Sequence, residues 1–451
     1  MSFLEQSLHT ANAEYINING DRQLFTNHYN ILRDTLYKTL QEEQPLGKWL
    51  CGHKLGGSYA DNLKITKPDE FDLVIHLKFP ENDRIIVKKD PRRPGNVTLD
   101  MTEVLNALEK QEHNKVSYTG LKKLVTNRNL LLEDKLQGMI NGAMTRALNK
   151  MGNQIEVNGR ATSVVYRRCG PAHTMFINDN GIKYSVDFVP AIRLIARQNI
   201  LEPEQLKYFK DIRYWDAIPK PLKPFEPNNV SFRASYYDAE NVMIKDKQKL
   251  KITIKFMKKF RDSKQNMNNL KSYYIKTLFL WQVKHKSDSY WSTKTLKDIL
   301  IDMCRELKTS LATSGRNGKL LFFWDPKLDL FAAFTPSQRE DMFNCVVAHL
   351  YTLERADGNL TADIDRNVIS SFSTRAERLS QDEQRNGRQK EAAPKQQPAP
   401  RQKQEPKQQP APKQQPAPRQ QPASGQQPAP RQQPAPSQQP PAKSSSSCCI
   451  A

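Results

Sequence analysis

The apolar positions of the chain follow two periods, and the change between them marks the expected helices and strands. Between residues 21 and 43, large apolar side chains recur every three to four positions, which predicts one long helix. Residues 70–79 mostly alternate between polar and apolar with a period of two. This pattern predicts a strand, which Pro80 ends.

The rest of the body continues these two patterns. They predict helices over 98–112 and 118–151, strands over 160–169 and 183–189, and a mainly helical second half from about Gln248. We therefore expect an α+β fold: a mixed sheet backed by the long N-terminal helix, followed by a helical lobe.

The C-terminal part has a different composition. After Asp382 the apolar residues disappear, and Gln-Gln-Pro-Ala-Pro recurs with Lys or Arg between copies. Such a segment buries too little apolar surface to offset chain entropy, so we expect an extended, disordered tether. The chain then divides into a sheet-containing core over 1–245, a helical lobe over 246–375, the tether over 376–447, and a terminal signal over 448–451.

The last four residues, Cys448-Cys449-Ile450-Ala451, have the order of a prenylation signal. Cys448 would accept the lipid, and Ala451 favours farnesyl. One lipid chain binds a membrane reversibly, and the basic tether would add attraction to anionic lipid. We expect a cytoplasmic protein that associates with membranes through this group; the alternative is an unmodified, reactive thiol pair.

Charge and cysteine content narrow the class of protein. The chain has 69 Lys and Arg against 48 Asp and Glu, a net charge of +21, and the body stays basic without its tail. This balance favours a polyanionic partner, nucleic acid first, over a merely solubilising surface. The four cysteines outside the terminal signal have no zinc-ligand spacing, and we find neither a secretion signal nor a long apolar run, which fits a reduced cytosolic protein.

The first candidate active-site residues are Gly56-Gly57-Ser58. A glycine pair lets backbone N–H groups approach a triphosphate closely. Twelve residues after the serine, Glu70 and Asp72 stand two apart on the predicted strand, so their side chains share one face. Two carboxylates on a rigid strand provide the oxygen ligands that Mg²⁺ requires, and the combination indicates nucleotidyl transfer.

A third carboxylate is expected from another strand. Tyr184 to Val189 alternates, and Asp187 falls on the face opposite Val186 and Phe188. Three carboxylates from two adjacent strands would hold two Mg²⁺ (or Mn²⁺) ions, one for the attacking hydroxyl and one for the leaving pyrophosphate. Asp187 alone would be an ordinary strand-edge carboxylate.

These segments together resemble the cyclic GMP–AMP synthase (cGAS) family. The resemblance rests on Gly57-Ser58-Tyr59, Lys64-Ile65, Pro68 to Asp72 and the strand of Asp187. It continues through Phe232 to Ser235 with Glu240, a lysine at 251, and Ser272-Tyr273-Tyr274-Ile275-Lys276-Thr277. The matches span about Trp49 to Leu280 in the family's order and look most similar to an animal cGAS-like receptor of the insect type.

The resemblance implies a role for each matched residue. Gly57 and Ser58 would hold the donor triphosphate, with Ser272 and Lys251 near phosphate. Arg233 and Ser235 would read a base, with Glu240 nearby, and Tyr273 would stack on a nucleobase. From the residues alone, Tyr273 could equally belong to a helix core and Lys251 to a solvated charged face.

One departure from the family bears on the activating ligand. The chain lacks the His and Cys spacing of the zinc-binding insertion in vertebrate cGAS, so we expect no zinc and favour double-stranded RNA over DNA. An RNA duplex would contact a basic surface without sequence readout. Candidate contacts are Arg22 and Lys38 on the long helix and a basic loop that contains Lys88, Lys89, Arg92 and Arg93, although that loop could also be a solvated hairpin.

Three functional hypotheses follow. The first is a cyclase that duplex RNA activates and that joins ATP and GTP into a cyclic dinucleotide. The second is an enzyme that makes a linear oligonucleotide or extends an RNA end. The third is a nucleic-acid receptor without catalysis, which the retention of all three acids disfavours.

Overall fold

The structure is a computed structural model that describes residues 2–16, 22–65, 67, 69–179, 181–312, 318–358 and 362–380. The side chains of Arg22 and of residues 358 and 362–364 lie outside this description. Residues 1–378 belong to one compact unit. Nearly all of the predicted tether, together with Cys448, lies outside the described residues, so both predictions stand untested.

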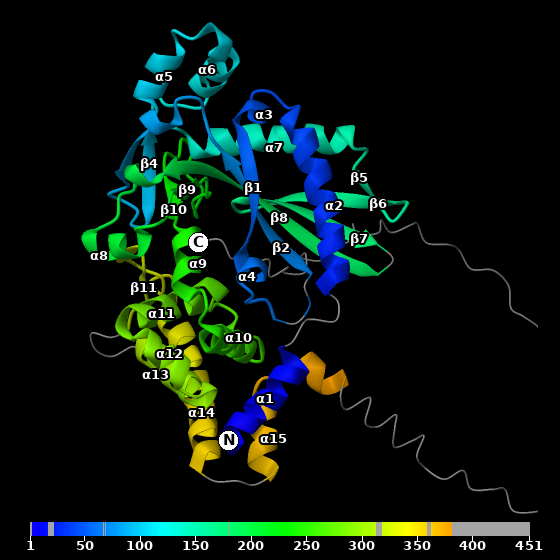
Figure 1. Ribbon diagram of the computed structural model, residues 1–451, viewed down its shortest axis with the longest axis vertical. Helices are drawn as coiled ribbons and strands as arrows, with labels where there is room; N and C mark the ends of the chain where they lie inside the picture. Colours follow the sequence, from blue (N-terminus) through cyan, green and yellow to red (C-terminus); the bar gives the residue numbers. More distant parts are fainter. Residues whose placement is uncertain are drawn as a thin grey trace, which may run out of the picture. The chain divides into compact units, whose positions relative to one another are not determined.

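The described residues form one large mixed sheet of ten strands (Figure 1). The longest strand, β8, pairs in parallel with β2 along one edge, while β7 and β9 share its other edge in antiparallel orientation. The strands are β1 (Leu50–Gly56), β2 (Glu70–Leu77), β3 (Ile86–Lys89), β4 (Asn96–Asp100), β5 (Gln154–Val157), β6 (Arg160–Cys169), β7 (Ala172–Asp179), β8 (Ile182–Ile195), β9 (Tyr214–Ile218) and β10 (Phe232–Ser235). Their order is β3-β4-β10-β9-β8-β7-β6-β5, with β1 beside β2.

The long N-terminal helix backs this sheet, as the periodicity predicted. Helix α2 (Arg22–Gln41) crosses in front of β2 and β8 in Figure 1. Its Tyr29 stacks on Phe71 of β2 with ring centroids 4.7 Å apart, and Phe71 and Leu73 are fully buried. Burying each such side chain contributes about 1.5–3 kcal/mol, so this apolar face fixes the orientation of β2. The carboxylates of β2 must then point to the opposite face.

Two of the predicted helices were placed wrongly. Residues 98–112 begin as β4, because Val97 and Leu99 are buried alternately while the strand pairs with β3 and β10. The helix α5 (Thr102–Leu108) starts only after Asp100, whose carboxylate accepts hydrogen bonds from the backbone and hydroxyl of Thr102. The predicted helix over 118–151 is two helices, α6 (Lys115–Lys122) and α7 (Glu133–Lys150), separated by a turn with a positive φ at Asn129.

The second half is mainly helical, as predicted, with one added two-stranded sheet. Its helices are α9 (Tyr237–Ile244), α10 (Gln248–Asp262), α11 (Ser272–His285), α12 (Asp288–Thr293), α13 (Leu296–Leu311), α14 (Pro336–Gly358) and α15 (Ala362–Ser371). The small sheet pairs β11 (Leu321–Phe322) with β12 (Asp325–Asp329). No helix in the described residues combines the length and the apolar content that a bilayer crossing needs.

The first helix of the chain, α1 (Phe3–Tyr15), lies against this helical lobe rather than against the large sheet. The Glu5 carboxylate accepts hydrogen bonds from the backbone N–H groups of Leu296 and Lys297, at 3.1 and 2.9 Å. These groups open α13 and have no partner within that helix, so Glu5 stabilises its N-terminus from a distant part of the sequence.

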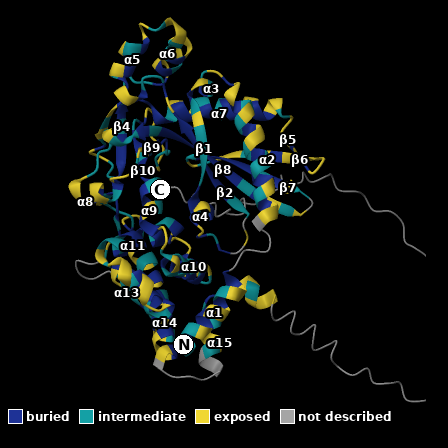
Figure 2. Cartoon of the chain, viewed as in Figure 1, coloured by how far each residue is buried: buried dark blue, intermediate teal, exposed yellow. Residues whose placement is uncertain are grey.

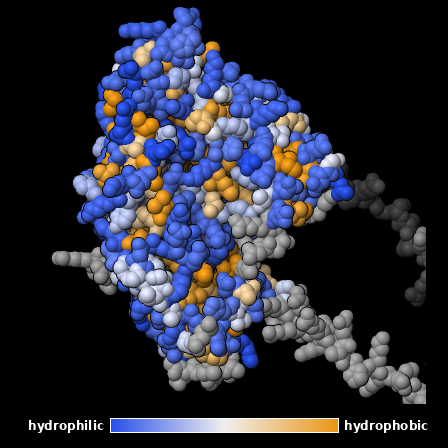
Figure 3. Space-filling model, in the orientation of Figure 1, coloured by the Kyte–Doolittle hydropathy of each residue, from blue (hydrophilic) through white to orange (hydrophobic). Residues whose placement is uncertain are grey.

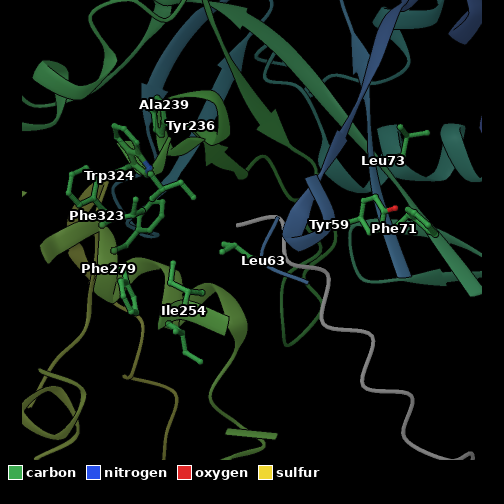
Figure 4. Packing of buried hydrophobic residues seen from close by; sticks show 14 of the residues in the cluster. Tyr59, Leu63, Phe71, Leu73, Tyr236, Ala239, Ile254, Phe279, Phe323 and Trp324 are labelled. Carbon is green, nitrogen blue, oxygen red and sulfur yellow. The ribbon is translucent and has the colours of Figure 1, made fainter. Parts of the chain in front are cut away.

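One apolar core continues from the large sheet into the helical lobe. Figure 4 shows Tyr59 and Phe71 at one end, Leu63 and Ile254 between, and Phe323 at the other end. Buried residues fill the strands in Figure 2, whereas the outward sides of α2 and α7 are exposed. Figure 3 shows that the face on which α2 lies is mainly hydrophilic. The continuous core holds the sheet and the helical lobe together around the candidate site.

Candidate active site

Strand register sets the positions of the acidic residues. In the parallel pair of β2 and β8, Asp72 lies directly opposite Asp187, and Glu70 lies opposite Ser185. The three carboxylates therefore occupy one face of two adjacent strands, as their alternation predicted. Asp72 is 5% exposed and Asp187 is 1% exposed. The hydroxyl of Thr174 on β7 donates a 2.5 Å hydrogen bond to Asp187 Oδ1 and orients this carboxylate.

The glycine turn lies directly against these acids. Strand β1 ends at Gly56, and the short helix α4 (Gly57–Ala60) begins at the next residue. Gly57 has a φ of +61°, and a Cβ added to it would lie 1.7 Å from Asp72 Oδ2. Glycine is required here both for the backbone conformation and for the close approach to the carboxylate. The turn and the acids thus form one structural unit.

The three carboxylates have the chemistry to bind a divalent cation, but not all of their side chains point to a common position. Asp72 and Asp187 offer carboxylate oxygens from opposite positions of adjacent strands, which suits Mg²⁺. Glu70 instead accepts a 3.1 Å hydrogen bond from Lys64 Nζ. Within the described part of the chain, no three acidic, histidine or cysteine side chains stand close enough to hold a metal ion. Recruitment of Glu70 requires that the carboxylate turn away from Lys64.

A small cavity joins the glycine turn to the helical lobe. Its volume is about 20 Å³. The sheet side contributes residues of α4 and the loop after it, and the helical side contributes residues of α10 and α11. The lining residues are Gly57, Ser58, Asp61, Leu63, Ile254, Lys258, Ser272, Tyr273 and Lys276. Four of the predicted nucleotide-binding residues, Gly57, Ser58, Ser272 and Tyr273, therefore meet in one place.

A buried network of charged and hydrogen-bonded groups crosses this boundary. Lys276 of α11 makes ion pairs with Asp61, at 2.8 Å, and with Glu240 of α9, at 2.9 Å. Burial acts to lower the pKa of Lys276, but the two carboxylates overcome this and raise the pKa above its ordinary value. The Tyr273 hydroxyl donates to Glu240 at 2.7 Å, and burial together with this carboxylate raises the pKa of Tyr273. Trp324 Nε1 donates to the same oxygen at 3.0 Å.

The predicted base-reading residues lie on β10, beside this network. The Arg233 guanidinium lies 5.7 Å from the centroid of the Phe322 ring, and Tyr273 approaches the same ring at 6.3 Å. Burial lowers the pKa of Arg233. Ser235 is 3% exposed and pairs with Asp216 of β9. Arg233 and Tyr273 therefore share Phe322 as a common neighbour.

The lysines that line the cavity differ from the one that the sequence suggested. Lys251, the predicted phosphate ligand on α10, is not among the residues that line it. Lys258, two turns later, lines the cavity, and its ammonium donates to the Leu63 carbonyl at 2.7 Å. Lys276 belongs to the matched motif Ser272–Thr277, but the sequence pattern assigns it no role. It stands in the apolar helix Ser272–His285, and a charge in such a helix signals a buried partner.

The predicted nucleic-acid contacts differ in their surroundings. Lys38 is exposed on α2, and the side chain of Arg22 lies outside the described residues. The predicted basic loop is a hairpin instead, with Lys88 and Lys89 on β3, which pairs with β4. Its four basic residues each face a carboxylate: Lys88 with Asp100 at 3.9 Å, Lys89 with Glu202, Arg92 with Asp90 at 4.0 Å, and Arg93 with Glu226. This pairing reduces the positive potential that the loop presents to a polyanion.

Comparison with known proteins identifies both lobes. The Mab-21 protein nucleotidyltransferase domain matches residues 59–246, and the Mab-21 protein HhH/H2TH-like domain matches residues 249–348. Cyclic GMP-AMP synthase-like receptor 1 of Drosophila melanogaster is 52% identical over 370 residues, which cover 82% of this chain and 97% of the relative. The same receptor of Drosophila erecta is 52% identical over 82% of each chain. A cyclic GMP-AMP synthase-like receptor of Lucilia cuprina is 40% identical over 82% of this chain and 97% of its own. The chain therefore belongs to the family of cyclic GMP-AMP synthase-like receptors, built from a Mab-21 nucleotidyltransferase domain and the helical domain that follows it.

Proposed function

We propose that this receptor is a cyclic dinucleotide synthase of innate immunity that joins ATP and GTP when double-stranded RNA binds. The observation that carries the proposal is the shared position of the acidic pair and the glycine turn. Asp72 and Asp187 are opposite partners in adjacent strands, and Gly57 packs against the Asp72 carboxylate. A triphosphate held by this turn has its α-phosphorus close to the acids.

The residues of the site divide the work of the reaction. A divalent cation held by Glu70, Asp72 and Asp187 would activate the attacking hydroxyl and neutralise the leaving pyrophosphate. Ser58 and the backbone of the glycine turn bind the donor triphosphate, and Lys258 and Ser272 lie on the opposite wall of the same cavity. Thr174 keeps the Asp187 carboxylate oriented toward the acidic face.

The residues around Phe322 select the nucleotides. Tyr273 stacks on one nucleobase while its hydroxyl stays on Glu240, and Arg233 and Ser235 read another. Lys251 lies outside the lining of the small cavity, and its contact with phosphate stays a prediction. The expected double-stranded RNA contacts along Arg22 and Lys38 stay a prediction, as does the basic loop.

The test uses purified protein with ATP, GTP and Mg²⁺, alone or with duplex RNA or duplex DNA. Mass spectrometry and nuclease sensitivity distinguish cyclic from linear products. We expect a cyclic dinucleotide only with duplex RNA. Product with DNA alone would keep the cyclase and overturn the choice of activator. Bound duplex with no product would favour a receptor without catalysis.

The membrane association predicted from Cys448 also stays a prediction. It requires that Ala451 be the end of the mature chain in the cell and that Cys448 carry a farnesyl group. Intact-mass measurement of the protein from eukaryotic cells, compared with a Cys448→Ser variant, checks both conditions.

A further inference from the structure

One face of the outer strands carries residues that the proposed reaction does not use. Val165 of β6 pairs with Phe176 of β7, Phe176 pairs with Ser185 of β8, and Ser185 pairs with Glu70 of β2. Side chains of directly paired residues lie on the same face of a sheet, so this face is continuous with the one that holds the carboxylates. We call it the outer face; it comprises Ser163, Val165, Arg167, Phe176, Asn178, Lys183 and Ser185.

The outer face is open, whereas the reverse side of the same strands is packed. Met175, Ile177 and Val186 point into the core and are at most 3% exposed. On the outer face, Val165 is 50% exposed and Phe176 is half-buried. A cavity of about 360 Å³ lies there. The lining residues are Asp69, Ser163, Val165, Phe176, Ile177, Asn178, Lys183, Tyr184 and Ser185.

The side chains of this face suit a nucleotide. The Arg167 guanidinium lies 5.6 Å from the centroid of the Phe176 ring, and Lys183 is exposed beside it. The carboxylate in the lining, Asp69, is paired with Lys64 at 3.6 Å, so it opposes a phosphate only weakly. Aromatic rings and guanidinium planes stack on bases, and neighbouring cations bind the phosphates that join them.

The distance to the reacting centre decides which nucleotide this is. Phe176 pairs with Ser185, two residues before Asp187 on β8, a separation of about 7 Å along the strand. A base stacked on Phe176 is therefore offset from the acids by about the length of one nucleotide, which suits the nucleotide next to the reacting one. The outer face also lies away from Arg233 along β8, because β7 pairs with the first half of β8, whereas β9, the neighbour of β10, pairs with its last residues.

We propose that the outer face is a subsite for a linear oligonucleotide acceptor, where it holds the nucleotide that precedes the reacting one. The inference rests on the proposed nucleotidyl transfer. The terminal hydroxyl of the bound oligonucleotide attacks the α-phosphorus of ATP, a new O–P bond forms, and the bond from that phosphorus to the oxygen bridging to pyrophosphate breaks. Pyrophosphate leaves and solvent takes the hydroxyl proton. The enzyme thus extends short linear oligonucleotides in addition to closing a dinucleotide.

The experiment offers a dinucleotide primer to the full chain. Protein, Mg²⁺, duplex RNA and labelled ATP are incubated with diadenylate that is linked either 2′–5′ or 3′–5′, and trinucleotide formation is measured beside cyclic dinucleotide formation from ATP and GTP. Phe176→Ala and Arg167→Gln are compared with Arg168→Gln. Arg168 is also exposed on β6, but its side chain projects from the opposite face.

We expect extension of at least one primer by the native chain. Phe176→Ala and Arg167→Gln should each raise the KM for the primer about tenfold, with cyclic product changed less than twofold and no effect of Arg168→Gln. Cyclic product without any primer extension would overturn the subsite while leaving the proposed function intact. Equal losses of both activities in Phe176→Ala and Arg167→Gln would also overturn it, because that result indicates a structural role. Primer extension without cyclic product would support the subsite and overturn the cyclase.

Discussion

The two halves of the candidate site are held in place by different means. The acidic half depends on backbone register, because Asp72 and Asp187 are opposite partners in a parallel strand pair whose other face is buried. The nucleotide half depends on side chains, because Lys276 joins Asp61 and Glu240 from three separate elements. The first arrangement tolerates changes in its surroundings, whereas the second fails if one member is lost.

Loss of an acid should have the largest effect on catalysis and the smallest on structure. Asp187→Asn keeps the shape and the partner Thr174 but removes a charge worth several kcal/mol in the transition state, so we expect turnover to fall by about 10³-fold or more. Duplex RNA binding and the urea unfolding midpoint should stay within error. Unchanged turnover would remove Asp187 from the reaction.

Loss of Lys276, the cation of the buried network, should have its largest effect on stability rather than on catalysis. Lys276→Met leaves two buried carboxylates without their cation, and we expect unfolding free energy to fall by about 3–5 kcal/mol. Lys284→Met on the same helix is the matched control. Its partner Glu204 is exposed, so we expect a much smaller loss of unfolding free energy than in Lys276→Met. Equal effects in urea titrations of the two variants would contradict the contrast between the two halves.

Substitution of Gly57 tests the point where the glycine turn contacts the acidic half of the site. In Gly57→Ala the methyl group collides with Asp72 Oδ2, and the displaced carboxylate should reduce turnover about 100-fold. Gly52→Ala separates crowding from backbone strain, since Gly52 also has a positive φ but no atom lies within 4 Å of an added Cβ. Steady-state kinetics of both variants distinguish these two causes. Comparable losses of turnover would assign the effect to backbone strain alone.

The smallest effect is expected at the Tyr273 hydroxyl. Tyr273→Phe removes one of two donors to Glu240 Oε1 while Trp324 keeps the other. The loss of about 1 kcal/mol should raise the nucleotide KM about fivefold and leave kcat nearly unchanged. Tyr274→Phe, next in sequence, serves as the control. A change in kcat with constant KM would place Tyr273 in the chemical step instead.

The sequence predicted the acidic half better than the nucleotide half for a physical reason. Period-two alternation assigns Glu70, Asp72 and Asp187 to a face, and register follows once the strands are adjacent. The network of Asp61, Glu240 and Lys276 arises from tertiary packing, which no local period encodes. The matched motifs indicated Tyr273 and Ser272 but did not indicate Lys258.

The errors in secondary structure have a related cause. Strand β7 went unpredicted because its first four residues, Ala172 to Met175, are all buried, so the alternation of polar and apolar positions is lost. Residues 98–112 read as a helix because the buried Val97 and Leu99 of β4 run directly into the apolar side of α5. In β7 burial on two sides concealed the strand period, whereas in β4 the strand was too short to be told from the helix that follows it.

The position of α1 has a consequence for motion within the molecule. The chain starts on the helical lobe, where Glu5 caps α13, passes to the sheet at α2, and returns after β10. Two bodies joined by two covalent connections cannot twist freely; they retain mainly rotation about the line through both connections. Any opening of the cleft between the lobes would then be mainly a single-axis movement, and cutting the chain between Ile16 and Arg22 would give the lobes the rotations that the native connection denies them.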